Sequence, residues 1–457
     1  MNWVIKNLWM AILNMKNLMR ERISIIQSEN PMKFIKKWKN IFILLVFFLS
    51  GCSFGKSNQM DQCIPIRIGV IIADDNLESG YEQKKGYDMA FDEINQAGGI
   101  QGCPVELVYE NVGEEASTES AQVAIMQLAE QNVLAIIGGT TNEVTMQAAT
   151  IASYFKVPLI IPTSTNDEIT KVGNQWIFRL RASNETDAKT AFEMVRGELG
   201  PATKVVILYE QTSYGESTAV VSATAAMASG LNVAGYYSYS NQDSDFSVLA
   251  ETINGIIPEV IYIISSNAEV ASNLLGVFQS QEVNSNMVIG HGPGFLERSF
   301  LYDGNELIYK NLENLILITS WSLDLPWAGL SEFSQEFQLF SQENNYNYSV
   351  SVTRNVETYT SLQLLANALE QITLSVPNAK EGEELSLDRL KQFREDLASS
   401  LRNLTADNRN TLFGTVVFDG TGQNRQSSVL VQILNGNIVT VYPPRYAIRS
   451  PYFIPGW

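Results

Sequence analysis

The sequence contains very little histidine: His291 is the only one among 457 residues. A Ser-His-Asp triad and a histidine-rich metal site are therefore unfavourable interpretations, and we expect no metal and no cofactor. No G-x-G-x-x-G follows the first predicted strand, which argues against a dinucleotide site of the usual kind. Without a phosphate loop or a nucleophile–base pair, an exported enzyme is a weak alternative.

Basic charge is scarce as well. The chain has a net charge of −18, yet residues 1–51 hold eight Lys/Arg and only two Asp/Glu. The remaining residues therefore have 23 basic and 47 acidic side chains, a net charge of −24. This excess disfavours nucleic acid as a partner and would repel an anionic membrane surface. Any attachment to a membrane must therefore come from a separate device.

The sequence contains such a device near its start. The basic segment 33–39 is followed by the apolar run Ile41–Leu49, which is too short to span a bilayer permanently and is typical of a signal peptide. The run ends in Leu49-Ser50-Gly51-Cys52, which resembles the bacterial lipobox. We therefore expect lipid on the thiol of Cys52. The alternative is a soluble secreted protein in which this cysteine has no role.

The lipoprotein interpretation divides the N-terminal part of the chain. Residues 1–51 become an N-terminal extension plus lipoprotein signal peptide, and Met32 is then the expected true start. Residues 52–63 become a short polar tether. The mature protein would be lipid-anchored at the cell envelope and would face the outside of the cytoplasm, in a periplasm or at the cell surface.

Two further cysteines precede predicted strands. Cys63 lies just before the apolar run Ile66–Ile72, and Cys103 lies just before Val105–Tyr109. If those runs are neighbouring parallel strands, the two cysteines lie side by side at one edge of the sheet. Because an exported protein is in an oxidising compartment, we predict a disulfide between them. Two buried thiols remain the alternative.

The most informative stretch runs from Leu134 to Thr165. It predicts a strand at Leu134–Ile137, a helix at Val144–Phe155 and a second strand at Pro158–Ile161, with a polar loop after each strand. Ligands of open α/β sheets bind at such loops, and a helix N-terminus attracts anions. The two loops have hydroxyl groups and free N–H groups, which suit a small carboxylate. Two ordinary strand-to-helix turns are the alternative interpretation.

The remainder of the chain alternates in the same way. Further strands are predicted at Val205–Tyr209, Val233–Tyr237, Val260–Ile264, Met287–Ile289 and Leu315–Thr319, and helices at Ser217–Ala228, Phe246–Ile253, Ala268–Gln279, Leu330–Asn344, Glu357–Leu374 and Leu387–Leu401. This alternation predicts a second doubly wound parallel sheet. The tail, with segments Thr415–Phe418, Ser428–Leu434 and Ile438–Tyr442, has an antiparallel pattern, and Asn435-Gly436 is a good hairpin turn.

Several motifs resemble one known family. They include Ile68-Gly69-Val70, the run Glu93–Gly102 (EINQAGGIQG), Val157–Pro162, Ile177-Phe178-Arg179 and Asp245-Phe246-Ser247. In these residues the chain resembles the type I periplasmic binding proteins of the branched-chain amino acid (Leu/Ile/Val) kind, which are the substrate-binding components of ABC importers. The resemblance covers about residues 64–445.

This resemblance implies the fold and its division. It implies an α/β protein with two doubly wound, Rossmann-like lobes joined by a three-stranded hinge. Lobe one would comprise residues 64–183 and 321–413, and lobe two residues 184–320 and 414–457.

The resemblance also implies ligand-binding residues. The family's carboxylate-binding positions fall on Asn142, Thr163 and Thr165, with Thr141 and Ser164 beside them. In lobe two, the family's tyrosine falls on Tyr214, and its aromatic residue falls on Ser266. The family's ammonium-binding glutamate falls near Gly292, so that subsite looks lost, although Glu297 could substitute. His291 could contact the ligand directly, or could simply be a histidine at a tight turn.

We therefore predict a solute-binding lipoprotein of an ABC importer. The expected ligand is a small, amino-acid-like molecule with a carboxylate or an amide, held between two lobes by hinge closure. The expected partners are ABC permease and ATPase subunits and, through the lipid, the membrane; the protein itself is expected to be a monomer. The alternative is a ligand-sensing receptor module that acts through a partner protein.

Overall fold

The computed structural model describes residues 64–74, 78–113, 117–171, 173–303, 306–308, 312–346, 354–374, 385–406 and 410–453. The predicted signal peptide, the lipidation site Cys52, the tether with Cys63 and the charged insert 377–384 lie outside these residues. No described helix combines the length and the apolarity that a membrane-spanning segment requires.

The first sheet is entirely parallel and has the strand order β2-β1-β3-β4-β5. Its strands are β1 (Ile66–Ile72), β2 (Val105–Asn111), β3 (Ala135–Gly138), β4 (Leu159–Ile161) and β5 (Ile177–Arg179). Ile66 of β1 is in register with Val105 of β2, which confirms that the two strands preceded by Cys63 and Cys103 are neighbours.

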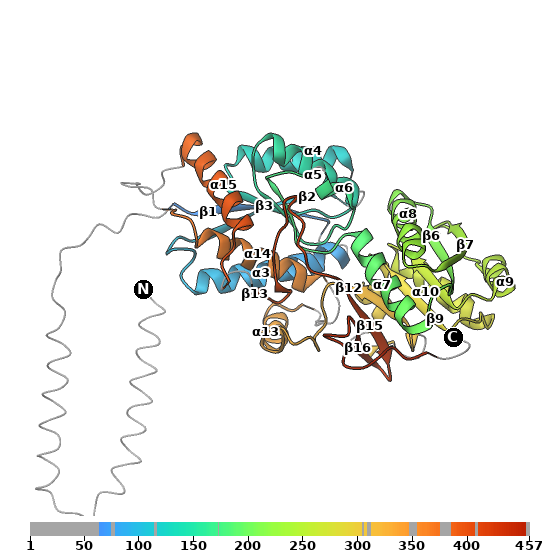
Figure 1. The fold of residues 1–457 in the computed structure, drawn as a ribbon. Coiled ribbons are helices and arrows are strands. Elements are labelled where there is room, and N and C mark those ends of the chain that lie inside the picture. The colour runs from blue at the N-terminus through green and yellow to red at the C-terminus, as the bar shows by residue number, and fades with distance from the viewer. Residues whose placement is uncertain are drawn as a thin grey trace, which may run out of the picture. The chain divides into compact units, whose positions relative to one another are not determined.

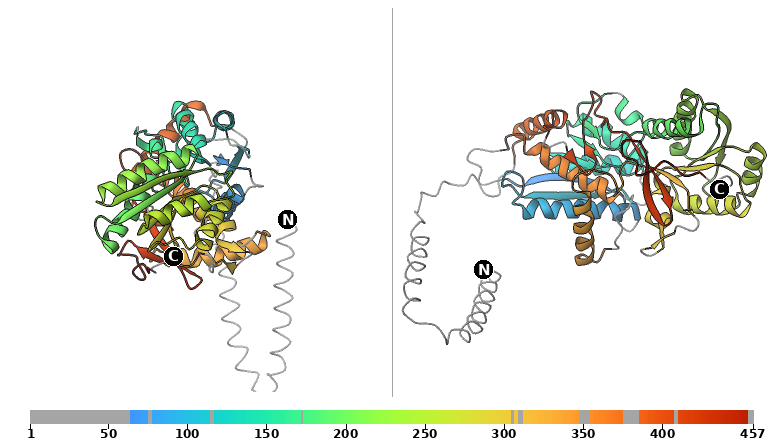
Figure 2. Two further views of the ribbon diagram at one scale, coloured as in Figure 1. Left: turned by 90° about the vertical axis from the view of Figure 1, so that its right-hand side faces the viewer. Right: turned by 60° about the horizontal axis from the view of Figure 1, so that its bottom comes forward.

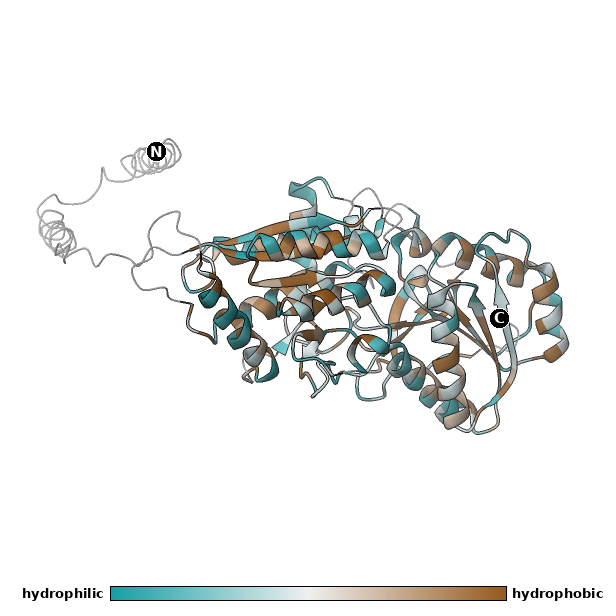
Figure 3. Cartoon of the chain, turned by 90° about the horizontal axis from the view of Figure 1, so that it is seen from above, coloured by the Kyte–Doolittle hydropathy of each residue, from teal (hydrophilic) through white to brown (hydrophobic). Residues whose placement is uncertain are grey.

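Helices cover both faces of this sheet. They are α3 (Glu78–Gln96), α4 (Thr118–Glu130), α5 (Asn142–Tyr154), α6 (Glu168–Lys171), α13 (Leu330–Glu343), α14 (Asn355–Leu369) and α15 (Leu387–Arg402). Figure 1 shows α4 and α5 on one side of the sheet and α3 and α14 on the other. The strands β1, β3, β4 and β5 are mostly buried and apolar, and the edge strand β2 is partly exposed. The helices have a hydrophilic side, as the colours of Figure 3 show.

The second sheet is mixed, with the strand order β16-β15-β12-β9-β8-β6-β7. Its strands are β6 (Lys204–Glu210), β7 (Asn232–Tyr239), β8 (Val260–Ile264), β9 (Met287–His291), β12 (Ile316–Thr319), β15 (Val429–Leu434) and β16 (Asn437–Tyr442). The first five are parallel, and β15 and β16 are antiparallel. The predicted hairpin is confirmed, because Asn435 and Gly436 join β15 and β16 at positive φ. Figure 2 shows this C-terminal hairpin, in dark red, from two further sides.

The helices of the second half are α7 (Asn184–Leu199), α8 (Ser213–Ala228), α9 (Ser247–Ile256), α10 (Ala268–Ser280) and α11 (Arg298–Leu301). Side chains of β8 alternate between the two faces. Val260, Tyr262 and Ile264 pack in the cluster that contains α7 and α8, whereas Ile261 and Ile263 pack in the cluster that contains α9 and α10. A strand buried on both faces is typical of a doubly wound sheet.

Two sequence-based predictions about the C-terminal half are wrong in detail. The predicted strand Thr415–Phe418 is reduced to β14 (Gly414–Thr415), paired with β13 (Asn410–Thr411). Beyond Thr415 the chain bridges only at Phe418 to Asn424. The helix predicted at Glu357–Leu374 ends at Leu369, so its last apolar residues lie in the following turn.

Candidate ligand-binding site

Three polar loops meet at the carboxyl edge of the first sheet. They follow β3, β4 and β5, which are parallel neighbours, so the loops lie side by side. Gly138 and Gly139 begin the first loop at φ +129° and +113°. A Cβ on Gly138 would lie 2.2 Å from the carbonyl oxygen of Ile71, so only glycine allows the chain to turn here.

These loops line a cavity of about 420 Å³ together with residues of the second half of the chain. All eight ligand-binding residues predicted from the sequence are on its wall: Thr141, Asn142, Thr163, Ser164, Thr165, Tyr214, Ser266 and His291. The sequence-based prediction thus selected side chains that surround one cavity, although the two groups come from different sheets.

Some of these hydroxyl groups hold the loops in place. Thr141 is the N-cap of α5, and its side chain accepts a hydrogen bond from the N–H of Val144 at 3.3 Å. The hydroxyl of Thr163 donates to the carbonyl oxygen of Gly139 at 3.2 Å, and the hydroxyl oxygens of Ser164 and Thr145 are 2.5 Å apart. Thr163 and Ser164 therefore fix the loop geometry with their side chains.

Other groups on the same wall retain free hydrogen-bonding capacity. Asn142 accepts a hydrogen bond from the N–H of Asn166 at 3.2 Å through Oδ1, which leaves its Nδ2 donors for the cavity. The hydroxyl groups of Thr140 and Thr165 have no hydrogen-bond partner among the described residues, and that of Thr140 is fully buried. Since the N-terminus of α5 lies here too, this wall favours an anion.

The opposite wall is formed by residues around the second sheet. It offers a ligand fewer hydrogen-bonding groups than the sequence predicted. Ser266 donates to Glu210 through both its N–H, at 2.8 Å, and its hydroxyl, at 2.5 Å. Its polar donors are therefore already engaged. The hydroxyl of Tyr214 lies over Gly292, where a Cβ would be 2.7 Å from it, and burial raises the pKa of this tyrosine. Tyr214 is thus a neutral wall residue with a hydroxyl group.

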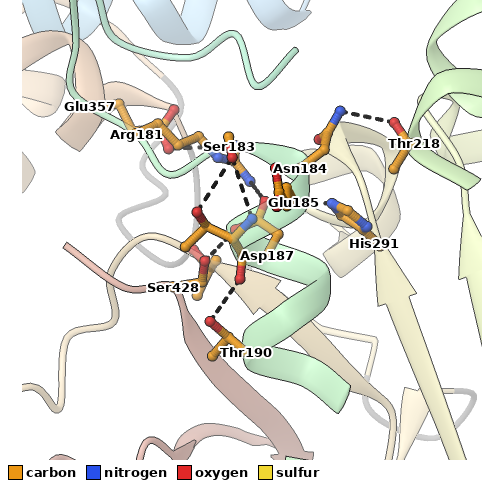
Figure 4. Close-up of polar contacts among 12 residues, drawn as sticks. Arg181, Ser183, Asn184, Glu185, Asp187, Thr190, Thr218, His291, Glu357 and Ser428 are labelled. Atoms are coloured by element: carbon orange, nitrogen blue, oxygen red, sulfur yellow. Dashed lines mark hydrogen bonds and ion pairs between the residues drawn. The ribbon is translucent and has the colours of Figure 1, made fainter. Parts of the chain in front are cut away.

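His291 is part of a buried polar chain. Its Nδ1 lies 2.7 Å from the hydroxyl of Tyr262, and its Nε2 lies 3.4 Å from Oδ2 of Asp187 (Figure 4 draws His291 and Asp187). The side chain is 1% exposed. Both ring nitrogens therefore face groups of the protein, so His291 shapes the cavity more than it offers a hydrogen bond to it.

Arg181, in the loop after β5, adds a buried positive charge. Its Nη1 lies 3.6 Å from Oε1 of Glu357, and its Nη2 lies 3.9 Å from Oδ2 of Asp187 (Figure 4). Burial raises the pKa of Glu357 to about 7, opposed by Arg181 and Arg354. Arg354 also lines the cavity, 3.9 Å from Glu297.

Glu297 is the candidate replacement for the lost ammonium-binding glutamate, and it does line the cavity. Burial raises its pKa to about 7, opposed by the nearby Arg354. Near neutral pH this carboxyl group is therefore only partly ionised. Arg354, 3.9 Å away, would also compete with an ammonium group for this carboxylate.

The site is equipped for binding, with hydroxyl, amide and guanidinium donors around a central space. Among the described residues, no cluster of three or more His, Cys, Asp or Glu side chains could hold a metal ion. The model for periplasmic binding proteins matches residues 65–437, most of the chain. The chain belongs to the periplasmic binding protein family. It is accordingly a solute-binding protein and not an enzyme, and the family supports the extracytoplasmic location.

Other periplasmic binding proteins match this chain along most of their length. Leu/Ile/Val-binding protein homolog 8 of Brucella abortus is 25% identical over 388 residues, which are 82% of this chain and 89% of that protein. The ABC transporter substrate-binding protein of Desulfitobacterium hafniense in complex with Leu is 22% identical, with a TM-score of 0.65, and the match covers 82% of this chain and all of that one. A solute-binding protein of R. palustris in complex with benzoate is 17% identical, with a TM-score of 0.64, and the match covers 85% of this chain and 99% of that one. The two structures share the fold, which confirms the type I periplasmic binding protein architecture.

Sequence reasoning missed several wall residues of this periplasmic binding protein. Thr140 stands directly before the predicted Thr141, and Arg181 lies two residues after the end of β5. Their positions after a strand could have found both. Glu143 accepts a short hydrogen bond from Ser213 across the cavity. Arg354 precedes α14 and gave no local signal, because it reaches the cavity through tertiary packing alone.

Proposed function

We propose that this protein is the solute-binding lipoprotein of an ABC importer and that it captures a small carboxylic acid or amide. The observation that carries the proposal is the pair of free donors at one wall of the cavity, on Asn142 and Thr165. These donors are uncharged and lie beside the N-terminus of α5, an arrangement that suits a carboxylate.

The ligands of related structures support this class. One protein of the same fold is in complex with leucine and another with benzoate. Both ligands have a carboxylate, and only leucine has an amino group. In this chain Gly292 stands near the place expected for the ammonium-binding glutamate, and Glu297 faces Arg354. We therefore propose that the carboxylate, and not an ammonium group, is the essential feature of the ligand.

Capture would occur by closure of two lobes. We propose residues 64–183 with 321–413 as lobe one and 184–320 with 414–457 as lobe two. The cavity wall draws on both sets, with Thr165 in one and Tyr214 in the other. A ligand that contacts both sets favours the closed form by its differential contacts.

The export features belong to the same proposal. Cleavage before Cys52 and lipid on its thiol would hold a monomeric protein at the outer side of the cytoplasmic membrane, where it delivers ligand to permease and ATPase subunits. We also propose a Cys63–Cys103 disulfide. Cys103 is 4% exposed, and Ile66, three residues after Cys63 in the sequence, pairs with Val105, two residues after Cys103.

Isothermal titration calorimetry against a panel of amino acids, short carboxylic acids and their amides tests the proposed ligand class. We expect saturable binding of at least one compound, and weaker binding after Thr165→Val. If no member of the panel binds, or if binding is indifferent to the Thr165 hydroxyl, the proposed ligand class is wrong.

A further inference from the structure

Arg181 lies beside the proposed carboxylate site. It follows β5, and the main chain on either side of it is tied to the loop after β4. Leu180 donates through its N–H to the carbonyl oxygen of Ile161 at 2.9 Å, and Asn184 donates to that of Thr165 at 2.9 Å. The guanidinium is 5% exposed and lines the same cavity as Thr165. Its charge is therefore held at a fixed place, one strand along from the free hydroxyl groups.

The hydrogen-bond donors of Arg181 are unused. No acceptor among the described residues lies within hydrogen-bond distance of its guanidinium, and its Nε is fully buried without a partner. The nearest carboxylates, of Glu357 and Asp187, are 3.6 and 3.9 Å away. Buried guanidinium groups ordinarily engage acceptors in close, planar pairs. The donors on Nη1 and Nη2, unlike the enclosed Nε, are consequently available to an acceptor that enters the cavity.

Two buried acids lie near this charge without bonding directly to it. Asp187 accepts a hydrogen bond from Ser428 through one oxygen and faces His291 with the other. Glu357 is buried, and burial raises its pKa to about 7, so it is only partly ionised at neutral pH. Figure 4 shows Arg181 with both acids. An anion that binds at Arg181 would therefore meet a guanidinium whose two neighbouring carboxylates lie beyond hydrogen-bond distance.

A purely structural role for Arg181 does not explain why Glu357 and Asp187 lie beyond hydrogen-bond distance of its guanidinium. A guanidinium that serves to join two parts of a protein would be expected to bond directly to the carboxylates beside it. The neighbouring Arg179 shows that behaviour, because its Nε donates to Gln423 at 2.5 Å and its Nη2 donates to Thr170 at 3.0 Å. Arg181 lacks such bonds and faces the cavity.

We propose that the ligand is a small dicarboxylic acid, whose second carboxylate is bound by Arg181. The inference rests on the proposed function, since the first carboxylate occupies the wall that includes Asn142 and Thr165. Arg181 is then the residue that determines specificity, by selecting acids with a second negative charge.

Calorimetry with matched pairs of acids tests the inference. The full chain is titrated at pH 7.5 with succinate and butyrate, glutarate and valerate, and adipate and hexanoate, so that each pair differs by one carboxylate. We expect at least one diacid to bind about tenfold or more tightly than its monoacid, because a charge-assisted pair adds roughly that factor. Monoacids that bind as tightly as all their diacids overturn the inference.

Single substitutions test whether Arg181 causes the preference for diacids over monoacids. Arg181→Gln is expected to lose the tenfold preference for the diacid while monoacid affinity stays within about threefold. Arg445→Gln, which removes an exposed arginine outside the cavity, should retain the preference. If Arg181→Gln does not fold, Arg181→Lys keeps the charge without the planar fork and should reduce the preference partly. A full preference that survives in Arg181→Gln or in Arg181→Lys, or an equal loss for monoacids and diacids, contradicts the assignment.

The two proposals fail in different ways. If monoacids bind and depend on Thr165, but a second carboxylate adds nothing, the inference about Arg181 fails and the proposed function stands. If the unaltered protein binds no acid of the series and none of the wider panel, both fail.

Discussion

Thr165 has a hydroxyl group that no other described residue engages, at a wall where the hydroxyl groups of its neighbours Thr163 and Ser164 already make hydrogen bonds. This contrast separates residues that build the loops from residues that can meet a ligand. It arises because the hydroxyl groups of Thr163 and Ser164 point back to the first loop. The same residue types in one short segment therefore have two different roles.

Replacement of Thr165 by valine should weaken binding of the best acid about tenfold, because a hydrogen bond to a charged acceptor contributes roughly 1.5–3 kcal/mol. Calorimetry measures the change. Thr150→Val, at an exposed position of α5, is the matched control and should leave the affinity unchanged. Equal affinities for the two variants would mean that Thr165 does not contact the ligand.

Glu357 should make stability depend on pH. Its pKa is raised from 4.5 to about 7 in the folded protein by burial, so the folded state binds the extra proton between these values. Stability is therefore highest below about pH 4.5 for this group and falls as pH rises through about 7, by up to about 3 kcal/mol.

Urea unfolding at pH 5.0 and pH 7.5 measures this contribution. Glu357→Gln should lose less stability than the unaltered protein between the two pH values, because glutamine does not titrate. Glu119→Gln, at an exposed position of α4, should behave like the unaltered protein. The same pH dependence in all three proteins would rule out the proposed effect of Glu357.

Sequence reasoning missed part of the site for a reason that is visible at the scale of single residues. Arg179 and Arg181 are two residues apart, and nothing local separates a bonded arginine from a free one. Arg179 is engaged by Gln423, which is 244 positions away, and Ser266 is engaged by Glu210, 56 positions away. Such partners are brought together only by the tertiary fold, so local sequence cannot reveal which donors remain free.

At the scale of elements, the loops after β3, β4 and β5 bring the residues of one cavity wall together. The sequence predicts most helices and parallel strands well, because their apolar residues recur with the period of a buried face. It predicts short terminal pairings poorly: Val416 and Phe418 are apolar and buried, yet their segment packs without continuing a strand. The burial of Val416 and Phe418 therefore does not mean that their segment pairs with a neighbouring strand.

The turn after β3 depends on a glycine. Gly138→Ala should destabilise the protein by at least about 2 kcal/mol, because the residue has φ +129° and the new Cβ would meet the carbonyl oxygen of Ile71. Gly197→Ala is the control: it lies in α7 with nothing within 4 Å of the Cβ, and should stabilise by about 0.5–1 kcal/mol. Denaturant unfolding measures both. A neutral effect of Gly138→Ala would show that the turn does not require glycine.

At the scale of the whole molecule, the proposed lipid anchor on Cys52 and the two proposed ligand-binding lobes are separate features. The acidic body gives no electrostatic attraction to an anionic membrane, so attachment should depend on Cys52 alone. Cys52→Ala should move the protein from the detergent phase to the aqueous phase in a Triton X-114 partition. Ser53→Ala, the adjacent control, should remain in the detergent phase. Retention of Cys52→Ala in the detergent phase would contradict lipid attachment at this residue.

The two proposed lobes contact each other through residues that are distant in sequence. Glu143 of α5 accepts a hydrogen bond from Ser213 of α8, and Glu78 of α3 accepts one from the N–H of Ser299 at 3.0 Å. These contacts connect elements of the first and second sheets around the cavity. A ligand held between the same elements should reduce the motion of both together.

Hydrogen–deuterium exchange with and without the tightest-binding acid tests this account most directly. The account predicts that saturating ligand protects two groups of peptides together: those around residues 139–145 and 163–166 of the first group of loops, and those around residues 212–216 and 291–294 opposite them. Protection of only one group, or protection confined to regions away from the cavity, would contradict capture of an acid between the two sheets.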